Sequence, residues 1–357
     1  MNEFELIQRF FMHSAKHPMS VPNGDDCAVF AIDADNELAV SSDTIVEGVH
    51  FPPYLPAHSI GYRGLAAALS DLAAMGADAR SFTVAITLAR DLERDGEAYL
   101  SQLSAGILDC ARRFDCDWVG GDLTTHERGP LIISYTVMGS LPKAKALTRS
   151  GARYGDDIYV SGVLGKSRLG LQWLLDREPS QRQALMQHFG NATIRDGSEF
   201  ATQLGGPKEA DGLIAFCYPT PRLALGVNLR SIAHSAIDIS DGLIADLAHI
   251  CDLSSERLGG HLGARLRFDQ IPIVTAETWQ QYDPRVYDPV VAFTHGDDYE
   301  LCFTAAPRFA DHLKSLSQQL GLGLHKIGEI IEQPGVQCLD ANGDEITMTQ
   351  TGYRHVK

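Results

Sequence analysis

The chain has 357 residues, of which 44% are hydrophobic and 21% are charged, a composition typical of a soluble globular enzyme and unlike that of a disordered chain. At about 150 residues per domain, this length predicts two domains or one large domain. The 46 acidic residues against 30 basic ones give a formal net charge of -16. That balance argues against nucleic acid as a partner, because no basic excess exists to neutralise phosphates.

The first residues show no basic flank followed by an apolar core, so we expect no signal peptide. They are typical of an amphipathic helix, with Phe4, Ile7, Phe10 and Phe11 along one stripe. No apolar run approaches the roughly 18 to 20 residues that span a bilayer. Seven scattered cysteines, none of them in a C-x-x-C pair, favour reduced thiols. We therefore expect a soluble, cytoplasmic protein that does not enter a membrane.

The first half of the chain alternates short apolar runs with helical patterns. An apolar strand over 38–40 ends in Ser41-Ser42-Asp43, which predicts that Asp43 stands at a strand end. The patterns that follow predict a helix over 60–75, a strand over 82–88, a helix over 97–114 and a strand over 131–138.

The same rhythm begins again after residue 151. We expect strands at 158–160, 236–239, 299–304 and 326–331, with helices over 169–175 and from about residue 241. This alternation predicts an α/β fold with some α+β character, built from two mixed units, residues 1–145 and 146–357. The more polar residues 176–216 are interpreted as a helical excursion or lid.

Several aspartates are predicted at the ends of elements rather than on solvated faces: Asp25, Asp26, Asp43, Asp122, Asp238 and Asp241. Asp71 lies inside an Ala/Leu-rich helical stretch, where an ionised carboxylate is costly unless a cation or hydrogen-bond donors meet it. Each aspartate alone is typical of a cap or a turn. Carboxylates that converge would repel one another, and hard divalent cations with oxygen ligands relieve that repulsion. A nucleotide–magnesium site is the leading physical hypothesis.

Two tempting motifs are set aside. Residues 162–167 read Gly-Val-Leu-Gly-Lys-Ser, but a P-loop needs a glycine where Val160 stands. Residues 321–323 lack the third glycine of a dinucleotide-binding motif and are typical of a helix C-cap. The lone histidines His50 and His295 lie near acidic motifs, and each favours a structural hydrogen bond over a catalytic base.

A series of motifs then matches a known family. In chain order they are Gly24-Asp25-Asp26-Cys27-Ala28, Ser42-Asp43-Thr44, Gly48-Val49-His50-Phe51, Ser70-Asp71-Leu72-Ala73-Ala74-Met75-Gly76-Ala77, Gly120-Gly121-Asp122, Leu147-Thr148-Arg149-Ser150-Gly151-Ala152, Asp238-Ile239-Ser240-Asp241-Gly242-Leu243 and Asp298-Tyr299-Glu300-Leu301. Together they closely resemble the thiamine-monophosphate kinase family, of the aminoimidazole-ribonucleotide-synthetase-like (PurM-like) ATP-binding superfamily. The resemblance runs from about residue 4 to Gly352-Tyr353.

The resemblance implies ATP-dependent phosphorylation of thiamine monophosphate to thiamine diphosphate. It also implies a two-domain PurM-like architecture whose N-terminal domains pair into a homodimer with a barrel-like centre. The acceptor phosphate is itself a nucleophile, so we expect direct in-line transfer without a phosphoenzyme and with no residue acting as acid, base or nucleophile. Both reactants are anionic, so several Mg²⁺ ions are expected to accompany ATP.

The resemblance also assigns roles by matching position. The magnesium ligands would be Asp26, Asp43, Asp71, Asp122, Asp238 and Asp241, with Ser41 and Ser42 at the edge of the cluster. The nucleotide would contact Gly121, Asp122, Arg149 and Ser240. Thiamine monophosphate would contact His50, Asp297 and Tyr353. One departure affects the last set, because Asp297 replaces the usual glutamate and is one methylene shorter.

Two alternatives stay open. One is another enzyme of the superfamily, such as selenophosphate synthetase or aminoimidazole ribonucleotide synthetase. A selenophosphate synthetase would be expected to carry a reactive cysteine and a nearby lysine in its N-terminal glycine-rich segment, whereas here the first cysteine is Cys27, inside the acidic motif. The other is a non-enzymatic divalent-cation or ligand-binding module, which would bind metal without turning nucleotide over.

Overall fold

A computed structural model describes residues 25, 27–89, 96–176, 180, 207–275, 290–346 and 352. The amphipathic helix predicted for the N-terminal residues and most of the 176–216 stretch lie outside these residues. None of the described helices has the length and apolar character needed to cross a membrane.

In the described part of the chain, the first half forms a five-stranded sheet of order β1-β2-β5-β3-β4. Its strands are β1 (Ala28–Ala31), β2 (Asn36–Val46), β3 (Asp78–Ala89), β4 (Asp117–His126) and β5 (Ile132–Pro142). The pairs β1–β2, β2–β5 and β5–β3 are antiparallel, whereas β3 and β4 are parallel. Helix α3 (Gly96–Arg113) connects the parallel pair, as the crossover between parallel strands requires.

Strand β2 does not end at Asp43, so that prediction is wrong. The strand continues to Val46 and pairs residue by residue with β5 along its whole length. The hydroxyls of Ser42 and Thr44 bind those of Thr136 and Ser134 across the two strands, at 2.8 and 2.7 Å. These polar side chains break the apolar run without breaking the backbone ladder, because cross-strand pairs of this kind stabilise a sheet.

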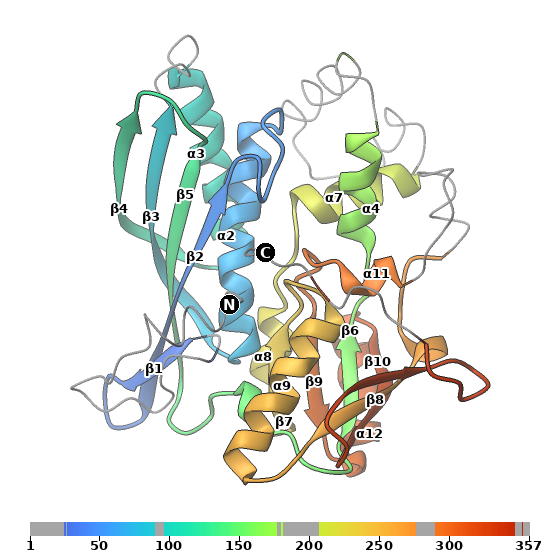
Figure 1. Ribbon diagram of the computed structural model, residues 1–357. Coiled ribbons are helices and arrows are strands. Elements are labelled where there is room, and N and C mark those ends of the chain that lie inside the picture. The colour runs from blue at the N-terminus through green and yellow to red at the C-terminus, as the bar shows by residue number, and fades with distance from the viewer. Residues whose placement is uncertain are drawn as a thin grey trace.

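Helix α2 (Ala57–Ala74) occupies the centre of the molecule. It packs on β2, β3 and β5 of the first sheet and on α8 (Leu223–Leu229) and β7 (Ala233–Asp238) of the second half (Figure 1). Nearly every position of α2 is buried, as expected for a helix that is apolar on all sides. This explains why its sequence is so rich in Ala and Leu, and it places Asp71 between the two halves.

The second half forms a six-stranded sheet in the described residues, of order β11-β8-β10-β6-β9-β7. The remaining strands are β6 (Asp157–Ser161), β8 (Gly263–Arg267), β9 (Leu301–Ala305), β10 (Leu324–Ile331) and β11 (Gly335–Leu339), and the helices are α4 (Lys166–Leu175), α7 (Pro207–Cys217), α9 (Leu243–Leu258), α11 (Val291–Thr294) and α12 (Ala310–Leu320), with short 3-10 turns at Arg149–Gly151, Phe268–Gln270 and Pro307–Phe309. The mixed α/β fold that the sequence predicts is confirmed.

The two halves share a core. Leu169 and Trp173 of α4 and Phe216 of α7 belong to the same buried cluster as Leu65 and Leu69 of α2. Helices from the second half therefore complete the packing of the first. The first sheet of a single chain is open, and its strand β4 is exposed along nearly all of its length.

Candidate active site

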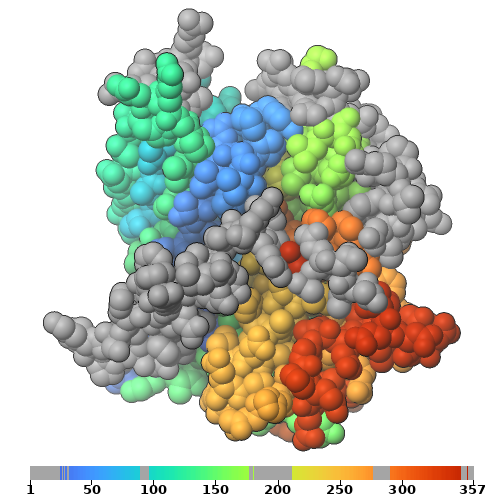
Figure 2. Space-filling view, viewed as in Figure 1, coloured from blue at the N-terminus to red at the C-terminus, as the bar shows by residue number. Residues whose placement is uncertain are grey.

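A cavity of about 560 Å³ lies between the two halves. Its walls come from β2 and the loop after it, from α2 and α4, from the turn between β7 and α9, and from residues 295–299. On the molecular surface the blue atoms of the first half adjoin the lime atoms of α4 (Figure 2). Segments that are far apart in the sequence therefore meet at one site.

The first wall carries two carboxylates that the sequence singled out. Asp43 lies inside β2 and Asp71 in the last full turn of α2, and both line the cavity. The hydroxyl of Ser41 donates a 2.5 Å hydrogen bond to Oδ2 of Asp71. Ser41 itself does not line the cavity, so its contribution is to hold a neighbouring carboxylate.

His50 also lines the cavity, and one contact determines the tautomer of its neutral ring. The backbone N–H of Val46 donates to its Nδ1 at 3.0 Å. Because Nδ1 accepts, the hydrogen of the neutral ring is carried by Nε2. A ring N–H at this position is suited to donate to an anionic oxygen.

The opposite wall is the turn from β7 into α9, which contributes Asp238, Ser240 and Asp241. Asp246, in the first turn of α9, is buried and accepts hydrogen bonds from the backbone N–H groups of Asp241 and Gly242 at 3.2 and 3.1 Å. Burial, and then the nearby carboxylates of Asp241 and Asp238, raise the pKa of Asp246 well above its usual value. The carboxylates of Asp238 and Asp241 therefore lie close enough to Asp246 to oppose its ionisation.

The donor chemistry of the cavity fits magnesium in one particular way. Within the described residues, no three carboxylate, imidazole or thiol groups are grouped closely enough to form a ready-made metal site. Mg²⁺ usually keeps several waters and takes one or two carboxylates together with substrate phosphates. The facing pairs Asp43 with Asp71 and Asp238 with Asp241 suit that arrangement better than an all-protein cage.

The segment after His295 is packed tightly on the β7–α9 turn. A Cβ at Gly296 would lie 1.6 Å from the carbonyl oxygen of Ser240, so only glycine fits there. The N–H of Asp297 donates to the same carbonyl at 2.9 Å. This contact fixes the position of Asp297 on the cavity wall.

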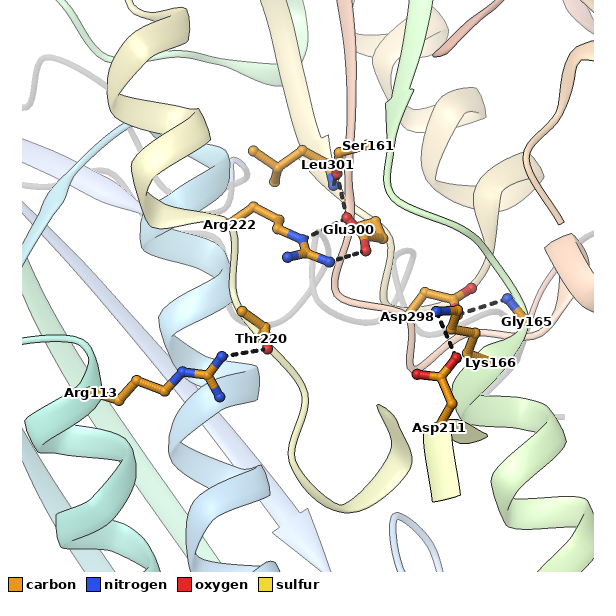
Figure 3. A network of polar contacts seen from close by, with 10 residues as sticks. All are labelled: Arg113, Ser161, Gly165, Lys166, Asp211, Thr220, Arg222, Asp298, Glu300 and Leu301. Carbon is orange, nitrogen blue, oxygen red and sulfur yellow. Dashed lines mark hydrogen bonds and ion pairs between the residues drawn. The ribbon is translucent and has the colours of Figure 1, made fainter. Parts of the chain in front are cut away.

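Sequence reasoning missed a cation of the site, Arg168, which lines the cavity from the first turn of α4. It follows directly on the Gly-Lys-Ser segment that resembles the end of a P-loop. The lysine of that segment, Lys166, is paired with Asp211 at 2.8 Å (Figure 3). The near-match to a phosphate-binding loop was the available signal, but the cation at the cavity is the arginine two residues later.

The residues named from the sequence fall into three groups. Those that line the cavity are Ser42, Asp43, His50, Asp71, Asp238, Ser240, Asp241 and Asp297. Gly121 and Asp122 lie on β4, which β5 and β3 separate from β2, so a single chain does not bring them to the cavity. Arg149 does not line it either, although its positive charge partly opposes the rise in the pKa of Asp246. Asp26 and Tyr353 lie outside the described residues.

A polar network next to the cavity connects residues 298–300 to other elements of the second half (Figure 3). Glu300 is buried and pairs with Arg222 through both carboxylate oxygens, and it accepts a 2.5 Å hydrogen bond from Ser161. Asp298 accepts the N–H of Gly165 at 2.9 Å with Oδ1, whereas its buried Oδ2 has no hydrogen-bond partner in the described part of the chain. Burial raises the pKa of Asp298 well above its usual value.

Asp298 is expected to make stability fall as pH rises. The folded protein holds the Asp298 proton to a higher pH than the unfolded chain, so between the two pKa values folding binds a proton and a rise in pH favours unfolding. Asp298→Asn removes the ionisable carboxyl group and keeps an acceptor for the N–H of Gly165. The difference in thermal midpoint, variant minus wild type, should increase as the pH is raised from about 5 to about 8. A difference that stays constant with pH would contradict the prediction.

Known proteins resemble this chain over most of its length. Residues 24–141 match the family model for AIR synthase related protein, N-terminal domain. The chain is 36% identical over 360 residues to thiamine-monophosphate kinase of Escherichia coli (strain K12), with 99% of this chain and 98% of the relative covered. It is 34% identical to that of Haemophilus influenzae, covering 94% and 91%.

Two solved structures are similar to this chain over most of its length. A thiamine-monophosphate kinase from Stenotrophomonas maltophilia K279a has a TM-score of 0.72 at 34% identity and covers 93% of each chain. A structure described as AaThiL complexed with AMPPCP and TMP has a TM-score of 0.75 at 24% identity, covering 99% of this chain and 97% of that one. The second of these supports the fold.

Proposed function

The chain belongs to the thiamine-monophosphate kinase family, and on that premise we propose that it transfers the γ-phosphoryl group of ATP to thiamine monophosphate, giving thiamine diphosphate. One observation carries this function. From both halves of the chain, several of the residues proposed to bind metal and substrate line a single cavity, and so does Ser240 of the proposed nucleotide set. A relative of the same fold is described with an ATP analogue and TMP.

The finer proposal is that the cavity's aspartates hold Mg²⁺. Asp43 and Asp71 from one wall and Asp238 and Asp241 from the other would be its protein ligands, and Asp26 and Asp122 remain proposed ligands from the family match. The bound ions would neutralise the charge of two anionic reactants. Around them, Arg168 and the Nε2–H of His50 are the groups suited to bind phosphate oxygens, by ion pairing and by hydrogen bonding.

The other part of the cavity is apolar and suits the rings of thiamine. Phe51, Pro52 and Tyr54 line it from the loop after β2, and Leu171 and Leu175 line it from α4. Apolar and aromatic side chains around a few polar groups are the usual lining of a small-molecule site. The acceptor phosphate would then lie toward the aspartates, where ATP and magnesium meet it.

We also propose a homodimer, a cytoplasmic location and a division into residues 1–145 and 146–357. The dimer is supported by β4, an exposed edge strand that carries Trp118, Val119 and Leu123 on its surface, since an uncovered apolar edge favours pairing. Gly121 and Asp122 lie on the same strand, so a second chain that packs here would cover them. All seven cysteines are buried and none of them forms a disulfide, which favours a reducing compartment.

The activity is tested by incubating the chain with ATP, MgCl₂ and thiamine monophosphate and following thiamine diphosphate by chromatography. Product that requires all three components supports the proposal. Consumption of ATP with selenide and none with thiamine monophosphate would support the selenophosphate synthetase alternative instead. Metal binding without any nucleotide turnover would support the binding-module alternative.

We expect direct transfer, without a covalent phosphoenzyme. The acceptor phosphate brings its own nucleophilic oxygen, and no cysteine is among the residues that line the described cavity. Incubation with γ-³²P-labelled ATP and no acceptor should leave the denatured protein unlabelled. Acid- or base-stable label on the protein, chased into thiamine diphosphate when acceptor is added, would contradict direct transfer.

A further inference from the structure

One carboxylate of the cavity is held by two donors on the same oxygen. Asp297 lines the cavity and is 32% exposed. Its Oδ1 accepts a hydrogen bond from the Nη2 of Arg63 and another from the hydroxyl of Tyr299, at 3.1 Å. Neither bond uses Oδ2. The second oxygen is therefore the one that can accept a hydrogen bond from a molecule in the cavity.

Arg63 is unusually well fixed for an arginine. It belongs to α2 and is only 1% exposed. Its Nη1 donates to the carbonyl oxygen of Phe216 at 2.6 Å, and its guanidinium carbon lies 4.3 Å from the centre of the Phe216 ring. A guanidinium stays charged inside a protein, and a buried one needs a counter-ion. Asp297 provides it, from a residue 234 positions later in the chain.

The backbone around Asp297 is held in an unfavourable conformation. Asp297 and Tyr299 have φ angles of 73° and 51°, in the left-handed region that is unfavourable for residues with a side chain. Their N–H groups bind the carbonyl oxygens of Ser240 and Ile239, each at 2.9 Å. The flanking carboxylates are engaged elsewhere, Asp298 with Gly165 and Glu300 with Arg222 (Figure 3). Strain kept at a site in this way commonly serves function.

The ion pair determines what Asp297 can do chemically. Because Arg63 already balances its charge, Asp297 has less need of a metal ion than the other aspartates of the cavity would. Its Oδ2 is suited to accept a hydrogen bond from a neutral N–H donor. Thiamine monophosphate carries one such donor group, the amino group on its pyrimidine ring.

We propose that Arg63 and Tyr299 are positioning residues, which bind Oδ1 of Asp297 so that Oδ2 receives the pyrimidine amino group and selects for it. This inference rests on the proposed function. It gives a role in selectivity to Arg63, which does not line the cavity, and to Tyr299, which does. It also accounts for an aspartate at this position, since the buried arginine fixes where the shorter carboxylate lies.

The test compares two acceptors, thiamine monophosphate and oxythiamine monophosphate, in which an oxo group replaces the amino group. Wild type should prefer thiamine monophosphate in kcat/KM. In Tyr299→Phe, which removes one donor and no charge, this preference should fall about tenfold, the usual effect of losing one hydrogen bond to a charged group. The loss should appear as a higher KM for thiamine monophosphate, while the KM for ATP stays unchanged.

Arg63→Lys supplies a second measurement, because lysine keeps the charge and loses the fork that binds Phe216 and Asp297 together. It should lose preference for the amino-bearing acceptor in the same way as Tyr299→Phe. Arg230→Lys is the matched control. Arg230 also binds a carbonyl, that of Gly76 at 2.5 Å, and a carboxylate, that of Asp78 at 2.7 Å, but neither partner lines the cavity. Its acceptor preference should equal that of wild type.

Wild-type turnover combined with an unchanged acceptor preference in Tyr299→Phe would overturn the inference and leave the proposed function intact. The same holds if Arg230→Lys shifts the preference as much as Arg63→Lys, because the effect would then be a general loss of packing. A wild-type chain that does not phosphorylate thiamine monophosphate would overturn the proposed function, and this inference with it.

Discussion

Asp43→Asn and Asp71→Asn are each expected to lower turnover of thiamine monophosphate by about a hundredfold or more. Both carboxylates line the cavity, and both are held by the fold: Asp43 by the β2–β5 ladder and Asp71 by the hydrogen bond from Ser41. Asparagine keeps the shape of the side chain and removes the charge that magnesium requires. The substitution therefore weakens stabilisation of the transition state. It should also raise the Mg²⁺ concentration needed for half-maximal turnover.

The measurement is paired for each variant. Turnover is titrated with MgCl₂, and thermal unfolding is followed without metal, where stability should hardly change because the substitution relieves repulsion among carboxylates. Asp311→Asn, in the first turn of α12 and outside the cavity, serves as the control and should behave as wild type. Near-normal turnover at unchanged magnesium demand would remove Asp43 or Asp71 from the site. A severe loss of metal-free stability would assign that residue a structural role.

Glu300→Gln is expected to lower the free energy of unfolding by about 3 kcal/mol, the low end of the cost of removing one partner from a buried ion pair, because the Arg222 side chain is 24% exposed. Glu300 is 5% exposed and binds Arg222 through both oxygens, with Ser161 as a third partner. The hydroxyl of Ser161 in turn accepts the N–H of Leu301 at the start of β9. Glutamine can replace only part of this network, and it leaves the guanidinium of Arg222 without its counter-ion.

Glu329→Gln is the matched control for Glu300→Gln. Glu329 also pairs with an arginine, Arg265, at 3.1 Å, but the two side chains are 51% and 39% exposed. Exposed pairs contribute about 0–1 kcal/mol, so this variant should lose little stability. Chemical denaturation of both variants gives the comparison. Equal losses in the two would show that burial is not the source of the stability that Glu300 provides.

Local patterns in the sequence were sufficient to predict most of the elements and their type. Helices α2 and α3 and strands β3, β5 and β6 lie within a few residues of their predicted ranges. Their apolar spacing follows the period of the element and needs no long-range information. Strand β4 was not predicted, because Gly120-Gly121 interrupts any strand pattern. A Cβ at Gly121 would lie 2.0 Å from the carbonyl oxygen of Val84, so glycine is needed for β4 to pair with β3.

For the candidate site, too, the sequence identified the side chains and the tertiary packing decided which of them meet. The motifs identified the carboxylates, because an aspartate in an apolar stretch such as that around Asp71 is costly to bury unless a cation or a hydrogen-bond donor contacts it. That holds whatever the rest of the fold. Which of them meet was decided by packing: α2, buried between two sheets, brings Asp43 and Asp71 opposite the turn of Asp238 and Asp241. The near-match to a phosphate-binding loop pointed to a cation near Lys166, but only the packing of α4 beside the cavity shows that it is Arg168.

The pairing of Arg63 with Asp297 is the plainest case of tertiary control. In the sequence Arg63 is one polar residue in a helical pattern, and 234 positions separate it from its partner. Its burial and its ion pair exist only once the two halves have packed, because neither half alone supplies both the charge and the carboxylate. Local spacing therefore determined the elements and the kinds of side chain available for chemistry. Contacts between the halves decided which of those side chains form the site, since convergence depends on distances that only the packed chain has.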